Sequence, residues 1–176
     1  MAEALRENAL RKLGIWGPLS PLGAALAALV FGADQAHKWW MLHVLNIETR
    51  QPVVITSFLD LILVWNQGVS YGLFKSHAQG LLIWASLIIS CVLWLWLCRS
   101  RRLLTVTALG LVIGGALGNA LDRYVYGAVA DFFHLHWHGW NWYVFNIADV
   151  AIVAGVGLLL YESFRERGAA RGLGNA

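Results

Sequence analysis

Long runs of apolar residues constrain the possible folds of this chain more than any other feature of its sequence. Four runs can be distinguished, at about residues 18–40, 79–98, 103–123 and 146–163. An α-helix rises about 1.5 Å per residue, so roughly 20 residues cross the hydrocarbon core of a bilayer, which is about 30 Å thick. The second and third runs reach this length outright, and the first and fourth reach it with their polar ends at the interface. The sequence therefore predicts four transmembrane helices.

The composition indicates the same class of protein. Of the 176 residues, 59% are hydrophobic and only 13% are charged. A soluble domain is about 25% charged and about 45–50% apolar, because polar side chains must cover its surface. The composition therefore excludes a soluble globular domain and a disordered chain. We expect an all-α integral membrane protein with a single membrane-embedded domain over residues 18–163.

The distribution of basic residues predicts the orientation in the membrane. The net charge of +3 could suggest a nucleic-acid-binding protein, but nine of the 13 lysines and arginines fall in three short segments. Such segments remain cytoplasmic under the positive-inside rule. We therefore expect cytoplasmic tails at 1–17 and 164–176, a cytoplasmic loop between the second and third runs, and no nucleic-acid partner. The nine residues are Arg6, Arg11, Lys12, Arg99, Arg101, Arg102, Arg165, Arg167 and Arg171.

The first run and the outer segment after it need separate interpretation. The run could be a cleaved secretory signal peptide, because basic residues precede its apolar core. Its continuation through Asp34 and Lys38, an acid–base pair at i,i+4 spacing, favours a retained helix. In the outer segment at 41–78, residues 52–56 and 59–65 are rich in β-branched and aromatic side chains and too short to span the membrane. They predict a small extramembrane sheet on the outer face.

Ionisable side chains at membrane depth are costly and commonly functional, and here they gather at the predicted outer side. Asp131 and Asp149 are both bracketed by apolar residues. Two carboxylates brought together in a poorly hydrated site share a proton, because both cannot ionise at close range. One could then take a proton from water while the other hydrogen-bonds a carbonyl under attack. The residues alone also allow an aspartate that caps the fourth helix and a separate loop aspartate in a salt bridge.

The third run combines glycines with a polar end. Glycine recurs at every fourth position from Gly110 to Gly118, which permits close helix approach in a bilayer. We interpret these glycines as a packing ridge without chemistry. Close packing is expected to bring the polar end of this run against a neighbouring helix, with the start of the fourth span favoured. Asn119, Asp122 and Arg123 follow, and their spacings place them on one helical face.

Histidines and cysteines are the other candidate functional residues. His134, His136 and His138 alternate, as would suit a metal site on a strand. They are interleaved with Leu and Trp and have no cysteine nearby, so we expect hydrogen-bonded residues at the membrane interface and no metal or other cofactor. Cys91 and Cys98 lie in or at the end of an apolar run, where free thiols that pack as small hydrophobic side chains are expected.

Five blocks of polar residues and glycines occur in order along the chain. They are Asp34-Gln-Ala-His-Lys38, Asn66-Gln-Gly68-Val-Ser-Tyr-Gly72, Gly114-Gly-Ala-Leu-Gly118-Asn119-Ala-Leu-Asp122-Arg123, Gly127-Ala-Val-Ala-Asp131-Phe132 and Phe145-Asn146-Ile-Ala-Asp149. In this order they resemble the bacterial lipoprotein signal peptidases, or signal peptidase II, which are membrane-embedded aspartic proteases. The resemblance covers roughly Pro18 to Tyr161. It departs from the usual family residues at Tyr71, Gly72 and Ala130, and in the histidine stretch.

The resemblance implies an enzyme that removes the signal peptide from a prolipoprotein, on the N-terminal side of a cysteine that carries a diacylglyceryl group. It implies that Asp131 and Asp149 are catalytic, and that other matched residues bind substrate or support the site. These are Asn66, Gly68, Asn119, Arg123 and Asn146 for binding, and Asp34, Lys38 and Asp122 for support. Such an enzyme would act as a monomer in the bacterial inner membrane, near its outer face and in contact with lipid.

Two other classes of membrane protein share some of these features. A small proton-coupled transporter would place acids near the middle of the membrane and on both sides, whereas the aspartates lie at one face. A structural subunit held by the glycine ridge would leave the aspartates and asparagines without a role. The peptidase is therefore the preferred hypothesis.

Overall fold

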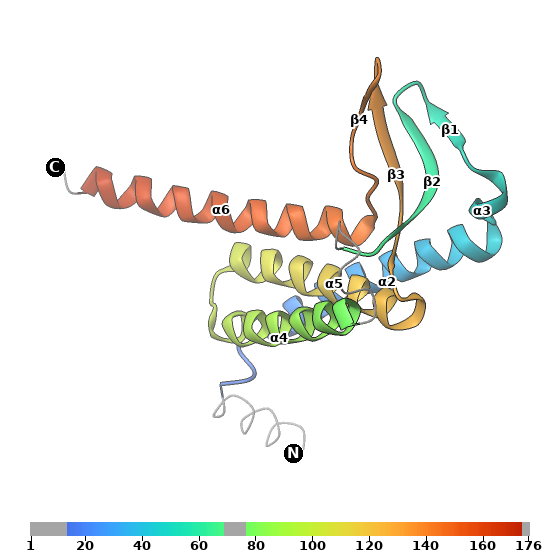
Figure 1. Cartoon of the computed structure of the whole chain (residues 1–176). Coiled ribbons are helices and arrows are strands. Elements are labelled where there is room, and N and C mark those ends of the chain that lie inside the picture. Colours follow the sequence, from blue (N-terminus) through green and yellow to red (C-terminus); the bar gives the residue numbers. More distant parts are fainter. Residues whose placement is uncertain (1–13, 69–76, 174–176) are drawn as a thin grey trace.

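The computed structural model describes residues 14–68 and 77–173, so Tyr71, Gly72 and the predicted tail up to residue 13 lie outside it. Its elements run from helices into strands and back twice along the chain (Figure 1). In order they are α2 (Ser20–Trp39), the π-helical turn η1 (Trp40–Val44), α3 (Ile47–Arg50), β1 (Val53–Thr56), β2 (Leu59–Asn66), α4 (His77–Arg99), α5 (Leu103–Tyr126), β3 (Val129–Trp137), β4 (Trp140–Asn141) and α6 (Ile147–Leu173).

The long helices form a bundle, and the strands stand at one end of it (Figure 1). Among the described residues, three helices are long and apolar enough to cross a membrane, over Gln79–Arg99, Leu103–Tyr126 and Ile147–Arg167. Helix α2 has 20 residues but is not one of the three. The four predicted runs are thus all helical, and three of them meet the criteria for a span. Helix α6 also continues well beyond the predicted end of its run at 163.

Helix α2 packs closely against α5. A Cβ atom added at Gly114 would lie 2.5 Å from the carbonyl oxygen of Ala27, so the two backbones nearly touch there. The ridge therefore packs against α2, while the polar end of α5 meets the start of α6, as the sequence predicted. Successive helical residues point about 100° apart, and a Cβ atom added at the neighbouring Gly115 would lie 2.5 Å from the carbonyl oxygen of Ala148 in α6. Helix α5 thus has glycine contacts on two sides, one for each partner helix.

The strands form one antiparallel arrangement in the order β1-β2-β3-β4. The two strands predicted at 52–56 and 59–65 are present as β1 and β2. The prediction was incomplete, because β3 and β4 come from the histidine-rich segment after α5. Strand β3 forms by pairing with β2, a contact between residues far apart in the sequence that a local pattern does not reveal. Between the pairs Leu61–Phe133 and Val64–Asp131, β2 holds one residue more than β3, which makes the ladder irregular.

A small apolar core fixes β3 against the segment after α2. Met41, Ile47, Ala130 and Phe132 are fully buried together. Burial of a side chain as large as that of Phe132 is worth roughly 1.5–3 kcal/mol. Because side chains alternate along a strand, anchoring Ala130 and Phe132 in this core directs Asp131 to the opposite face of β3.

A tight turn joins α5 to β3. Gly127 has a φ of +70°, and its N–H donates to the carbonyl oxygen of Arg123 at 3.1 Å. Glycine adopts this left-handed conformation without strain and commonly ends a helix in this way. The turn returns the chain immediately to the sheet, so Asp131 comes to lie beside the polar end of α5.

Candidate active site

Asp131 lies on β3, where two asparagine side chains hold its carboxylate. Asn66, the last residue of β2, donates from Nδ2 to Asp131 Oδ2 at 3.0 Å. Asn146 donates from Nδ2 to Asp131 Oδ1 at 2.7 Å. Asp131 is 1% exposed. Each carboxylate oxygen therefore has one amide donor, and the orientation of the group is fixed.

Asp149 lies in the first turn of α6 and bonds reciprocally with Asn146, the residue before the helix. The Asn146 N–H donates to Asp149 Oδ2 at 3.2 Å, and the Asp149 N–H donates to Asn146 Oδ1 at 2.9 Å. This pattern is that of a capping box, which residues three apart form at a helix start. The capping role that the sequence allowed for Asp149 is thus present. The Asp149 side chain also lies at the positive end of the α6 dipole.

Two asparagines join the aspartates into one site. Asn119 of α5 donates from Nδ2 to Asp149 Oδ1 at 2.9 Å, and its own Oδ1 accepts from Asn146 Nδ2 at 3.1 Å. Asn146 thus contacts both aspartates as well as Asn119. The sheet, α5 and α6 therefore meet at a pair of carboxylates within one hydrogen-bond network.

Burial sets the protonation of Asp131. Loss of hydration raises the pKa of the Asp131 carboxyl to about 6; the hydrogen bond from Asn66 lowers this pKa and the negative charge of Asp149 raises it. A carboxyl group that gains and loses a proton near neutral pH, beside a second carboxylate, is suited to acid–base chemistry.

A cavity of about 580 Å³ opens beside Asp131. Its lining combines Asn66 and Gly68 with aromatic side chains, among them Trp65, Trp142 and Tyr143. Such a lining offers hydrogen bonds to a backbone and apolar contacts to side chains or lipid. The cavity is large enough for a short segment of peptide to approach the carboxylate.

Arg123 lies between the network and this cavity. Its Nη1 donates to the carbonyl oxygen of Asn119 at 3.2 Å, and its Nη2 would lie 3.4 Å from a Cβ atom added at Gly68. Its Nε is buried and has no hydrogen-bond partner among the described residues. The guanidinium therefore keeps one donor that the described residues do not use.

A buried charged cluster supports the site from α2. Lys38 Nζ lies 2.7 Å from Asp34 Oδ2, 2.7 Å from Asp122 Oδ2 and 3.3 Å from Asn119 Oδ1. The two aspartates also hold neighbouring segments. Asp34 accepts from the Ala148 N–H through its other oxygen, Oδ1, and Asp122 accepts from the Ala130 N–H through the same Oδ2 that contacts Lys38. The cluster therefore ties α2 to α5, to the start of α6 and to β3.

Sequence reasoning missed Gln35 as a member of this cluster. Its Nε2 donates to Asp122 Oδ1 at 2.9 Å, and to Asp34 Oδ2 and the carbonyl oxygen of Gly118 at 3.2 Å each. The signal was available, because an uncharged polar residue beside Asp34 in an apolar run needs a buried partner.

The expectation that ionisable groups gather only at the outer side also needs correction. Glu162, late in α6, is 6% exposed and accepts a hydrogen bond from Thr105 Oγ1 at 2.6 Å. Arg102 lies near it and also contacts Glu166. This group occupies the opposite end of the bundle from Asp131, and its carboxylate is satisfied by neighbouring side chains.

A family model described as signal peptidase (SPase) II matches residues 26–165, which include every residue of the site described above. The chain belongs to the signal peptidase II family. It is therefore a membrane peptidase.

Individual relatives and solved structures agree with this assignment. The lipoprotein signal peptidase of Methylocella silvestris is 51% identical over 159 residues, which cover 86% of this chain and 91% of the relative. That of a Methylobacterium species is 50% identical over 145 residues, covering 81% and 88%. A solved structure described as a bacterial membrane enzyme, determined by the in meso method at 2.3 Å resolution, matches with a TM-score of 0.71 and 26% identity, covering 84% of this chain and 90% of that chain. The fold is that of a membrane enzyme.

Proposed function

We propose that this chain is an aspartic endopeptidase that removes the signal peptide from diacylglyceryl-modified prolipoproteins, cutting on the N-terminal side of the lipidated cysteine. The observation that carries the proposal is the pair of carboxylates, Asp131 and Asp149, held by one asparagine, Asn146. Family membership supplies the substrate class, since the relatives described above are lipoprotein signal peptidases.

The two aspartates take different parts in the reaction. Asp149, at the positive end of the α6 dipole, accepts a proton from water as the water oxygen attacks the scissile carbonyl carbon. Asp131, protonated, donates its proton to the carbonyl oxygen, and a tetrahedral diol forms. The diol then collapses: the C–N bond breaks, the leaving nitrogen gains a proton from Asp149, and Asp131 recovers its own. Arg123 and Asn66 hold the peptide backbone in the cavity beside the pair.

We infer that α2 is the fourth membrane span. Its 20 residues correspond to about 30 Å of helix, the thickness of the hydrocarbon core. Asp34 and Lys38 lower its mean hydropathy, but both are buried against neighbouring helices and do not face lipid. Leu29, by contrast, is 67% exposed, as expected of a side chain in contact with lipid.

We further propose that the protein lies in the bacterial inner membrane with the sheet outside. The basic loop at 99–102 lies at the end of the bundle away from the strands (Figure 1). Ser20, at the start of α2, contacts Cys98 near this loop, and Arg102 contacts the late part of α6. The basic loop thus shares one end with the start of α2 and the late part of α6, and the positive-inside rule assigns this end to the cytoplasm.

The direct test of the function is incubation of the purified protein with a lipidated prolipoprotein, with release of the signal peptide followed on a gel. The same precursor without its diacylglyceryl group is the matched control. We expect cleavage of the lipidated precursor only. Absence of cleavage by folded protein contradicts the proposal, and equal cleavage of both precursors contradicts the part that concerns the lipid.

The topology gives a separate prediction. A reporter that is fluorescent only in the cytoplasm should be active when fused after Ala176, and a reporter active only outside should be active when inserted in the turn at Gly139. The reason is the clustering of basic residues at the end opposite the sheet. The reverse pattern of activities would contradict the proposed orientation.

The protonation of Asp131 predicts a pH profile. The reaction needs this carboxyl protonated, and its pKa is about 6, so kcat/KM should fall about tenfold per pH unit as the pH rises above that value. Asn66 stabilises the ionised form, so Asn66→Ala should raise the Asp131 pKa and move the falling limb to higher pH. A limb that stays in place or moves to lower pH would show that it reports another group.

A further inference from the structure

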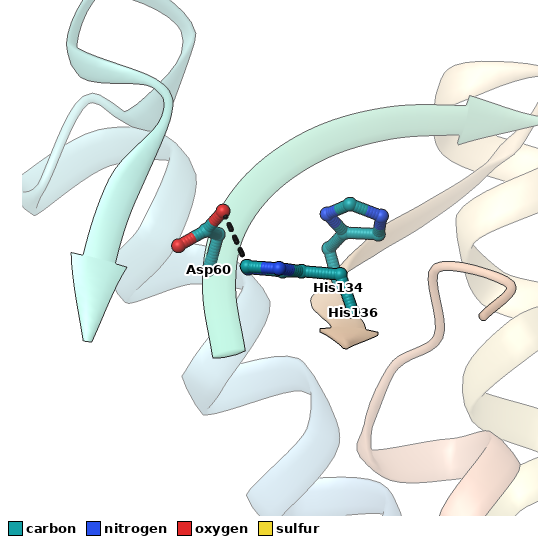
Figure 2. A group of neighbouring side chains, drawn as sticks. All are labelled: Asp60, His134 and His136. Carbon is teal, nitrogen blue, oxygen red and sulfur yellow. Dashed lines mark ion pairs between the residues drawn. The ribbon is translucent and has the colours of Figure 1, made fainter. Parts of the chain in front are cut away.

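Two histidines and an aspartate form a second polar cluster, on the part of the sheet beyond the candidate active site. Asp60 of β2 lies directly opposite His134 of β3. His136 lies two positions further along β3, on the same face as His134. Figure 2 shows both imidazoles extending from β3 on the side where the Asp60 carboxylate lies. One candidate ligand atom from each of the three residues lies within 4.8 Å of the other two.

The contacts within the cluster leave binding capacity unused. His136 Nε2 lies 3.0 Å from Asp60 Oδ2, a separation that requires a proton or a cation between the two lone pairs. The other oxygen, Asp60 Oδ1, is buried and accepts no hydrogen bond from the part of the chain that the structure describes. The His134 and His136 rings stack with their centroids 5.3 Å apart. A half-buried carboxylate with a free oxygen therefore lies beside two imidazoles.

We propose that Asp60, His134 and His136 bind a divalent transition-metal ion, with Zn²⁺ preferred over Mg²⁺ and Ca²⁺. Imidazole nitrogens and a carboxylate oxygen are common zinc ligands, whereas Mg²⁺ and Ca²⁺ prefer oxygen ligands throughout. Zinc bonds of about 2.0–2.2 Å place tetrahedral donor atoms about 3.4 Å apart. Side-chain rotation brings the three donors to this spacing, and water takes the fourth position.

The alternating histidines of the sequence, which were not expected to form a metal site, are a different set of residues. His134, His136 and His138 alternate, but His138 follows the end of β3, is exposed and has a φ of +45°. The third ligand is instead Asp60, which strand pairing brings from a distant part of the chain. The expectation of no metal was based on the histidine stretch alone, which does not contain this carboxylate.

The position of the cluster indicates what the ion does. The ion joins β2 to β3 on one side of the irregularity between Leu61 and Val64, and the hydrogen bond from Asn66 to Asp131 joins the same strands on the other side. Alternation along β3 places the histidines on the face opposite Asp131. The ion therefore stabilises the pairing of the two strands and takes no part in peptide hydrolysis.

The test uses full-length protein in detergent, free of any histidine tag and stripped with EDTA, titrated with Zn²⁺ by calorimetry. We expect one ion per chain, and Co²⁺ in its place should give the visible absorption of a four-coordinate site. Asp60→Asn and the double variant His134→Gln/His136→Gln should each weaken Zn²⁺ binding at least tenfold. The matched control is His138→Gln, which removes a neighbouring histidine and should leave the affinity unchanged.

Thermal melting gives an independent readout. Zn²⁺ should raise the melting temperature of the parent protein and of His138→Gln, but not that of the double variant. EDTA-stripped parent protein should still cleave a lipidated prolipoprotein at temperatures where it is folded, so this test and that of the peptidase function can fail separately. Absence of Zn²⁺ binding by the parent, the result expected of a simple Asp60–His136 ion pair, overturns the proposal. Binding that the double variant retains overturns it as well.

Discussion

Replacing Asp131 or Asp149 by asparagine is expected to abolish cleavage of a lipidated prolipoprotein while the protein remains folded. An amide cannot take up and release the proton that each carboxyl group exchanges in the proposed reaction. General acid–base groups contribute about 10²–10⁴-fold to rate, and residues that act as a unit show most of the loss when either one is removed. We therefore expect kcat to fall about 10³-fold or more in each variant, measured as release of signal peptide in detergent.

The folded state should survive both substitutions. Asn66 and Asn146 donate one hydrogen bond each to Asp131, and an asparagine there keeps an oxygen that accepts one of them. Melting temperature and gel-filtration profile check this point. Glu48→Gln is the matched control, because it makes the same change of acid to amide at an exposed site outside the network and should leave turnover unchanged. Turnover close to that of the parent in either aspartate variant would remove that residue from the proposed mechanism.

The sequence predicted the parts of this molecule that depend on local pattern. Runs of apolar residues locate the four long helices because their length and composition are properties of contiguous residues. The reciprocal bonds of Asn146 and Asp149 also follow from a spacing of three at a helix start. The two strands in the segment before α4 were predicted from composition alone.

What the sequence left open depends on contacts between distant segments. Strand β3 exists through its pairing with β2, and only that pairing brings Asn66 to Asp131 and Asp60 to His134. The partner of the glycine ridge could not be predicted either, because α2 and α6 both offer small residues to α5. The choice between them follows from how the whole bundle packs.

The charged cluster behind the site shows why such a network is easily disrupted. Lys38 bridges Asp34 and Asp122, and the side chains of all three are at most 3% exposed. Taking charges out of water is costly, and mutual attraction offsets that cost only while each buried charge keeps an opposite charge beside it. Removal of Lys38, the partner of both aspartates, should therefore cost more stability than the ion pairs contribute in net terms.

Lys38→Met should destabilise the protein by about 3–5 kcal/mol, because it leaves Asp34 and Asp122 buried without their cation. In a chain of this size that loss corresponds to a fall in melting temperature of roughly 10 °C or more. Asp34→Asn should be much milder, since Lys38 keeps Asp122 as its partner. Asp34→Asn combined with Lys38→Met should recover part of the loss by removing one uncompensated charge.

Activity should fall only partially in Lys38→Met, because Lys38 reaches Asp149 only through Asn119. Thermal melting in detergent ranks the three variants. A Lys38→Met protein that melts like the parent would show that the cluster is hydrated in solution. A Lys38→Met protein that is more stable than the double variant would show that Asp34 and Asp122 share a proton without help from Lys38.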